Sequence, residues 1–144
     1  MRPRRYTEAE WRKKGISEAG TAMVEFALVA TLFFILFFGV IDFSRLMFMY
    51  HHVGNAARAG SRFAIVHGSS SLSPASANDI QNYVRSISVL DPNDVNVSTT
   101  WPDGNNNPKS RVNVRVDYPF TFTLPIWFGS GITLESTSQM VISY

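Results

Sequence analysis

An apolar run near the start of this 144-residue sequence constrains its fold more than any other feature. Between Thr21 and Ile41 the only charged side chain is Glu25, and residues 26–41 contain none. As an α-helix this run would be about 31 Å long, close to the ~30 Å thickness of a bilayer's hydrocarbon core. A buried helix in a water-soluble protein would need a large shell of protein around it. The run therefore predicts a membrane-spanning helix.

The flanking charges predict its orientation. Six Lys or Arg residues precede the run, whereas three (Arg45, Arg58 and Arg62) follow it closely. Because basic residues are retained on the cytoplasmic side, we expect the N-terminus in the cytoplasm and the C-terminus outside it. The run is also longer than the ~7–15 apolar residues of a secretory signal peptide, and no small-x-small cleavage site follows it closely. An ordinary secretory signal is therefore not expected.

Composition excludes several function classes. Beyond residue 20 the chain carries seven basic and eight acidic side chains, so we expect no nucleic-acid partner. The sequence has no cysteine, which excludes thiol catalysis, disulfides and a Cys zinc site. His51 and His52 are adjacent, so on a helix they point about 100° apart and cannot chelate as an i,i+4 pair does. With no catalytic motif present, we expect no enzyme activity, metal or cofactor.

A glycine directly before the apolar run and a glutamate within it form the most informative motif. Counted from Gly20, Thr21 is +1 and Glu25 is +5. After a basic leader, this resembles the type IV prepilin signal, which a membrane aspartyl peptidase cuts after the glycine. The resemblance implies that Glu25 pairs with the new N-terminal amine of a neighbouring subunit. A charge in hydrocarbon is costly unless paired, although snorkelling to the cytoplasmic headgroups is the alternative.

Two segments make the resemblance more specific. Residues 20–28 (GTAMVEFAL) and residues 56–62 (AARAGSR) resemble the TadE-like minor pseudopilins of the tight-adherence (Flp/Tad) pilus system. This implies a subunit that acts in pilus assembly, adhesion or secretion, in the bacterial inner membrane or in a surface pilus. Its implied partners are a prepilin peptidase, other pilus subunits, the inner-membrane assembly platform and the lipid bilayer.

The sequence departs from related patterns at two positions. Thr21 stands at +1, where ordinary type IV pilins have phenylalanine, so methylation of Thr21 stays open. Phe26 stands at +6, where the small Flp pilins have tyrosine. The alternative function is an unprocessed single-span membrane protein whose outer domain binds a partner.

Helical periodicity continues beyond the span. Apolar residues recur at spacings of three, four or seven, which predicts one helix from about Ser17 to Val66; they are Phe43, Leu46, Met47, Tyr50, Val53, Ala57 and Ala64. We expect this stripe to pack on the chain's own outer domain, with another subunit as the alternative. Ala56 and Gly60 form a small-xxx-small pair that permits close helix approach.

The remaining sequence predicts a small outer domain. Ser76 or Asn78 would cap a short helix with Ile80, Tyr83, Val84 and Ile87 on one face. Alternating residues predict strands near 95–101, 111–122 and 132–142. The apolar residues Ile126, Trp127 and Phe128 are expected to contact another subunit, the membrane surface or the sheet.

Together these patterns predict an α+β fold: a long N-terminal transmembrane helix extending outside the membrane, a small antiparallel sheet of about three strands, and one short helix. The expected organisation is a cytoplasmic basic leader (1–20), a transmembrane helix (21–41), an amphipathic helix extension (42–66) and an extracytoplasmic α+β domain (67–144). The candidate site residues are Gly20 and Thr21 for processing, Glu25 for subunit pairing, Phe26, Leu28, Phe33 and Phe37 for contacts within the membrane, and Ala56 and Gly60 for helix packing.

Overall fold

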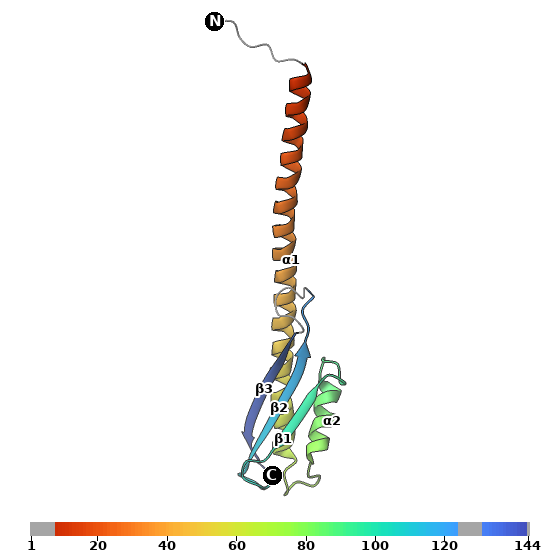
Figure 1. Ribbon diagram of the computed structural model, residues 1–144. Helices are drawn as coiled ribbons and strands as arrows, with labels where there is room; N and C mark the ends of the chain where they lie inside the picture. The colour runs from red at the N-terminus through yellow and green to blue at the C-terminus, as the bar shows by residue number, and fades with distance from the viewer. Residues whose placement is uncertain (1–7, 124–130, 144) are drawn as a thin grey trace. The chain divides into compact units, whose positions relative to one another are not determined.

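The computed structural model describes residues 8–123 and 131–143 of the chain (Figure 1). It contains helices α1 (Glu8–Val66) and α2 (Ala77–Ile87) and strands β1 (Asn96–Thr100), β2 (Arg111–Phe120) and β3 (Ile132–Val141). The α+β fold predicted from the sequence is thereby confirmed. The chain divides into two compact units, Met1–Ile41 and Asp42–Tyr144, and α1 contributes to both.

Helix α1 begins earlier than the sequence analysis predicted. The expected start was about Ser17, but the helix starts at Glu8. Residues 8–14 are mostly strong helix formers such as Glu, Ala, Arg and Lys, which explains the earlier start. Gly15 and Gly20 each disfavour a helix by roughly 1 kcal/mol, and neither ends it. Residues 8–20 of the predicted leader and the apolar run are therefore parts of one helix.

Helix α2 starts with a capping box. The Ser76 side chain accepts a hydrogen bond from the backbone N–H of Asp79, and the Asp79 carboxylate accepts one from the backbone N–H of Ser76 at 2.9 Å. This satisfies two donors that would otherwise be unpaired at the helix start. Of the four residues predicted on its apolar face, Ile80 and Val84 are buried, Tyr83 is half-buried and Ile87 is exposed.

The three strands form an antiparallel sheet in the order β1-β2-β3 (Figure 1). In its register Val97 lies opposite Val116, and Val114 lies opposite Ser138. Alternation puts Val112, Val114 and Val116 on the buried face. The opposite face is polar, and on it Arg115 forms salt bridges with Asp117 and Glu135.

The outer half of α1 covers the buried face of the sheet. Its contribution to the core is made mainly of small residues, including Ala56, Ala57 and Ala64. The Ser61 hydroxyl donates a hydrogen bond to the Ser138 carbonyl oxygen at 3.0 Å, and the Ser143 N–H donates one to the Ile65 carbonyl oxygen at 3.0 Å. Small side chains on α1 let the sheet approach the helix backbone closely.

The predicted apolar stripe on α1 is only partly correct. Its members Val53, Ala57 and Ala64 are buried in the outer domain, and Leu46 packs against that core. In contrast, Phe43, Met47 and Tyr50 are exposed. The sheet packs on the line of small residues, which lies to one side of the line through these larger ones, so only part of the stripe is covered. The apolar residues Ile126, Trp127 and Phe128 lie outside the described residues.

Candidate functional site

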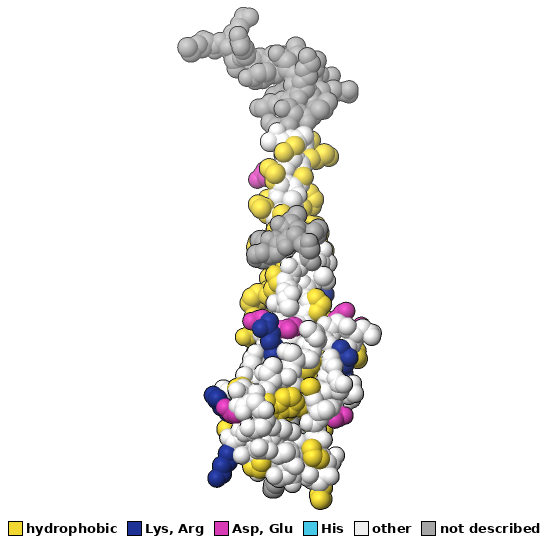
Figure 2. All heavy atoms as spheres, turned by 60° about the horizontal axis from the view of Figure 1, so that its bottom comes forward, with side chains coloured by type: hydrophobic (Ala, Val, Ile, Leu, Met, Phe, Trp, Pro, Cys, Tyr) yellow, Lys and Arg dark blue, Asp and Glu magenta, His cyan; other side chains and the backbone are white. Residues whose placement is uncertain are grey.

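Apolar side chains surround α1 between Met23 and Ile41, and Figure 2 shows one face of this segment. The predicted membrane contacts Phe26, Leu28, Phe33 and Phe37 are all exposed, Phe26 at 74%. A helix that is apolar all round is typical of a large protein core or a membrane span. Within the described residues, none of its most apolar stretch is buried by other parts of the chain. The chain thus has a candidate membrane span near its N-terminus, which supports a membrane-anchored single-pass protein.

Aromatic rings form rows along this segment. The rings of Phe33 and Phe37 stack with centroids 6.0 Å apart, and those of Phe34 and Phe38 stack at 6.4 Å. Residues four apart lie on the same face of a helix, so each pair forms a ridge on the surface. These ridges are available for contact with lipid or with another apolar helix.

The predicted processing site lies within α1. Gly20 is exposed, and a Cβ added there would meet no heavy atom within 4 Å. Glu25 is also exposed, about 6 Å along the helix axis from Thr21. Among the described residues none makes a hydrogen bond or ion pair with Glu25. A partner for this carboxylate would have to come from outside the described part of the chain.

Asp42, directly after the predicted span, is a site residue that the sequence analysis missed. It is 2% exposed, and its two carboxylate oxygens accept hydrogen bonds of 3.1 and 3.0 Å from the backbone N–H of Thr123. Arg45 donates to Asp42 Oδ1 at 3.1 Å and to Thr123 Oγ1 at 2.7 Å. We call these three residues the Asp42 clamp. Only the i,i+3 spacing of Asp42 and Arg45 signalled part of it in the sequence.

The Asp42 clamp also involves an aromatic contact. The Arg45 guanidinium lies 5.5 Å from the ring centroid of Phe120, the last residue of β2. This is within the distance at which a cation is attracted to the face of an aromatic ring. The clamp thus fastens the end of β2 and the residues that follow it to α1.

The predicted packing pair Ala56 and Gly60 faces the chain's own outer domain. A Cβ on Gly60 would lie 2.7 Å from Val84 Cγ2 and 2.9 Å from Val114 Cγ1. Only glycine permits α2 and β2 to approach α1 this closely. Ala56, four residues earlier, is 5% exposed.

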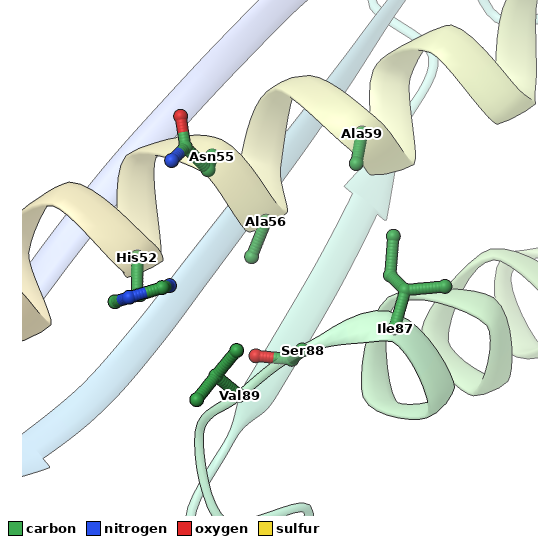
Figure 3. Close-up of a pocket in the computed structure, with 7 residues that line it drawn as sticks. All are labelled: His52, Asn55, Ala56, Ala59, Ile87, Ser88 and Val89. Atoms are coloured by element: carbon green, nitrogen blue, oxygen red, sulfur yellow. The ribbon is translucent and has the colours of Figure 1, made fainter.

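A shallow pocket lies between α1 and the end of α2 (Figure 3). Its volume is about 120 Å³, and it is lined by His52, Asn55, Ala56, Ala59, Ile87, Ser88 and Val89. Alanine and aliphatic side chains dominate the lining, and His52 is its only titratable group. The pocket can accept a small apolar group and offers no acid–base pair.

The histidines do not assemble a metal site in the described residues. His51 is exposed, and His52 is half-buried. The ring centroids of His52 and Phe48 are 4.3 Å apart. His67 Nδ1 is hydrogen-bonded to the Phe63 carbonyl oxygen at 2.8 Å. No group of three or more His, Cys, Asp or Glu side chains that could hold a metal ion occurs in the part of the chain that the structure describes.

The loop between β1 and β2 contains an ion pair with the first residue of β2. Arg111 forms a salt bridge of 2.7 Å with Asp103, whose carboxylate also accepts the Arg111 backbone N–H at 2.7 Å. These hydrogen bonds lower the pKa of Asp103 from 3.8 to about 2. The pair fixes the loop that joins β1 to β2.

Comparison with known proteins bears on the N-terminal part of the chain. The family model for TadE-like proteins matches residues 20–62. The match begins at Gly20 and includes Glu25, the apolar helix, Asp42 and the Ala56–Gly60 pair. No curated protein and no solved structure matches the chain. The resemblance inferred from the sequence is confirmed over the matched residues.

Proposed function

We propose that this chain, TadE-like over residues 20–62, is a minor pseudopilin that acts as a structural subunit in tight-adherence pilus assembly. The family match supports a protein related to the Tad pilus. The observation that carries the finer proposal is the exposed apolar stretch of α1, which begins directly after Gly20 and up to Ile41 contains one acidic residue, Glu25. We propose a structural role and no catalysis.

In this proposal a prepilin peptidase cuts between Gly20 and Thr21 on the cytoplasmic side of the inner membrane. The exposed backbone at Gly20 supports access, because no described side chain crowds that position. Since α1 is helical on both sides of the bond, the peptidase has to unwind a short stretch to reach it. Cleavage would create a positive α-amine about 6 Å along the helix from Glu25.

The proposed role of Glu25 is to pair with that amine on a neighbouring subunit. A carboxylate at the centre of a bilayer costs ~2.5–3.5 kcal/mol, and less near the interface, so an opposite charge in the membrane favours association. The lack of a partner for Glu25 among the described residues supports an intermolecular role. The bilayer, other pilus subunits and the assembly platform would be its surroundings.

The decisive measurement is the intact mass of the protein extracted from membranes of cells that carry the pilus system. We expect an N-terminus at Thr21. Gly20→Val should block cleavage, whereas Gly15→Val, the same change five residues upstream, should not. A full-length mass for the unmodified protein would contradict processing and favour the alternative, an unprocessed single-span protein with a partner-binding outer domain.

A further inference from the structure

The exposed surface of α1 stays mainly apolar well beyond Ile41, with Ser44 and Arg45 as the exposed polar residues. Phe43, Phe48 and Tyr50 are 60%, 52% and 52% exposed, and Met47 is also exposed. From residue 51 onward the exposed residues become polar or basic, with Val66 at the helix end as the exception; the polar ones are His51, Asn55, Arg58 and Arg62. The change in surface chemistry therefore falls between Tyr50 and His51, nine residues after the apolar run ends.

The length of the helix up to this change matches a whole bilayer. From Thr21 to Tyr50 there are 30 residues, which rise about 45 Å, and a bilayer with its headgroups is ~40–45 Å thick. A hydrocarbon core that starts at Phe26, just after the charged Glu25, extends for about 20 residues and ends near Arg45. The next five residues then occupy the outer headgroup layer.

We propose that the segment Phe43–Tyr50 of α1 is a lipid-binding surface that lies at the outer membrane–water interface. Its partner is the boundary between acyl chains and headgroups, where aromatic side chains are enriched. The inference rests on the membrane anchoring in the proposed function, and it is independent of leader cleavage. It moves the outer edge of the span from Ile41 to about Arg45.

The Asp42 clamp explains how Asp42 and Arg45, both charged, can lie at the outer edge of the hydrocarbon core. Asp42 is almost completely buried, accepts hydrogen bonds from the Thr123 N–H and is paired with Arg45. A charge near lipid is tolerated when it is paired and hydrogen-bonded. The guanidinium of Arg45 donates hydrogen bonds to Asp42 and Thr123, so its charge is paired where the hydrocarbon core ends.

The arrangement of the aromatic residues favours lipid over a second protein chain. Phe43 and Phe48 are five residues apart, which places them about 140° apart around the helix. A packed helix covers a stripe of roughly 100°, so one neighbouring helix would leave one of these rings uncovered. Lipid surrounds a helix on every side that the chain's own domain does not cover. Lipid around the helix can therefore contact both exposed rings at once.

Spin-label depth measurements on the full chain test this inference. Because the sequence has no cysteine, single cysteines can be introduced at Leu36, Phe43, Phe48, Tyr50 and Arg62 without removing others. Each variant is labelled, reconstituted in phosphatidylcholine vesicles with a quarter of phosphatidylglycerol, and probed with oxygen and a water-soluble nickel complex. Circular dichroism confirms that each variant keeps its helix and sheet content.

We expect labels at 36, 43 and 48 to be more accessible to oxygen than to nickel, the label at 50 to lie near the crossover, and the label at 62 to show the reverse. Nickel accessibility at 43 and 48 equal to that at 62, with 36 in lipid, would overturn the inference and leave the membrane anchor intact. Low accessibility to both reagents at 43 and 48 would also overturn it and indicate a second chain there. Nickel accessibility at 36 would overturn both the inference and the anchor.

Discussion

Both carboxylate oxygens of Asp42 accept hydrogen bonds from the backbone N–H of Thr123, a residue 81 positions later in the chain. The contact therefore joins distant parts of the chain through a carboxylate that is 2% exposed. Asp42 is the first residue of the outer compact unit, so the clamp determines where the segment after β2 meets α1.

We expect Asp42→Ala to lower the free energy of unfolding of the outer domain by about 2–3 kcal/mol. Its two carboxylate oxygens share one Thr123 N–H, and one hydrogen bond to a charged group contributes ~1.5–3 kcal/mol. Arg45→Ala should lower the same free energy of unfolding by about 1 kcal/mol or less, because the Arg45 side chain is partly exposed and solvent weakens its ion pair with Asp42. Thermal unfolding in detergent, followed by circular dichroism, measures both. Equal losses for the two variants would show that the Thr123 hydrogen bonds are not the main contribution.

Gly60 and Gly54 form a matched pair for testing close packing on α1. In Gly60→Ala the new methyl group would lie 2.7 Å from Val84 and 2.9 Å from Val114, and such overpacking typically costs ~1–3 kcal/mol. In Gly54→Ala the nearest atoms are 3.6 and 3.8 Å away, so the gain in helix propensity should stabilise by about 0.5–1 kcal/mol.

The two glycine variants should therefore shift the unfolding midpoint in opposite directions. Gly60→Ala should cost less in a Val84→Ala background than in the unmodified protein, because Val84→Ala removes the closest clash. Stabilisation by Gly60→Ala alone would mean that α2 and β2 can move away from α1 at little cost.

Local patterns in the sequence predicted the elements well. Alternation placed Val112, Val114 and Val116 on the buried face of β2, and Ser76 caps α2 as one of the two expected residues. These features depend on residues a few positions apart, where periodicity and capping chemistry act directly. The family match over residues 20–62 also confirmed the resemblance carried by Gly20 and Glu25, which lie only five positions apart.

Features that depend on distant residues were not predictable. Nothing near Asp42 in the sequence indicates Thr123 as its partner, because their contact depends on how β2 ends against α1. The side of α1 that the sheet covers was also misjudged, since Met47 and Tyr50 were expected to pack but are exposed. The prediction put all the apolar residues of this part of α1 on one buried face. In the structure the sheet packs on the small residues, such as Ala57 and Ala64.

Asp103 gives the outer domain a specific dependence on pH. Its pKa is lowered from 3.8 to about 2 by hydrogen bonds from Arg111, so its stabilising effect is complete above pH 4 and is lost as the pH falls toward 2. We expect Asp103→Asn to lower the unfolding midpoint at pH 6 and to have a smaller effect near pH 2. Thermal melts across this range test the expectation, and an equal effect at both pH values would contradict it.

Glu25→Gln should separate membrane insertion from assembly under the proposed function. The amide keeps the size of the side chain and removes the charge, so cleavage and membrane insertion should be unchanged while pilus assembly falls. Glu25→Asp keeps the charge and should retain part of the assembly. Pili sheared from the cells, together with the intact mass of the membrane-bound protein, provide both readouts. Normal piliation with Glu25→Gln would remove the argument for charge pairing between subunits.

The final prediction concerns the outer half of α1 as a part of the outer domain. Residues 67–144 alone should fold poorly, whereas a fragment from about Asp42 should melt cooperatively. Residues 42–66 supply Val53, Ala57 and Ala64 to the core, and Ser61 is hydrogen-bonded to β3. At ~25 cal/mol per Å², covering a few hundred Å² of the sheet contributes several kcal/mol, comparable with the whole stability of a small domain. As a control, Val53→Ser in the longer fragment should lower its melting temperature, because it removes a fully buried apolar side chain from the core. Equal cooperative melting of both fragments would show that α2 and the sheet are sufficient without α1.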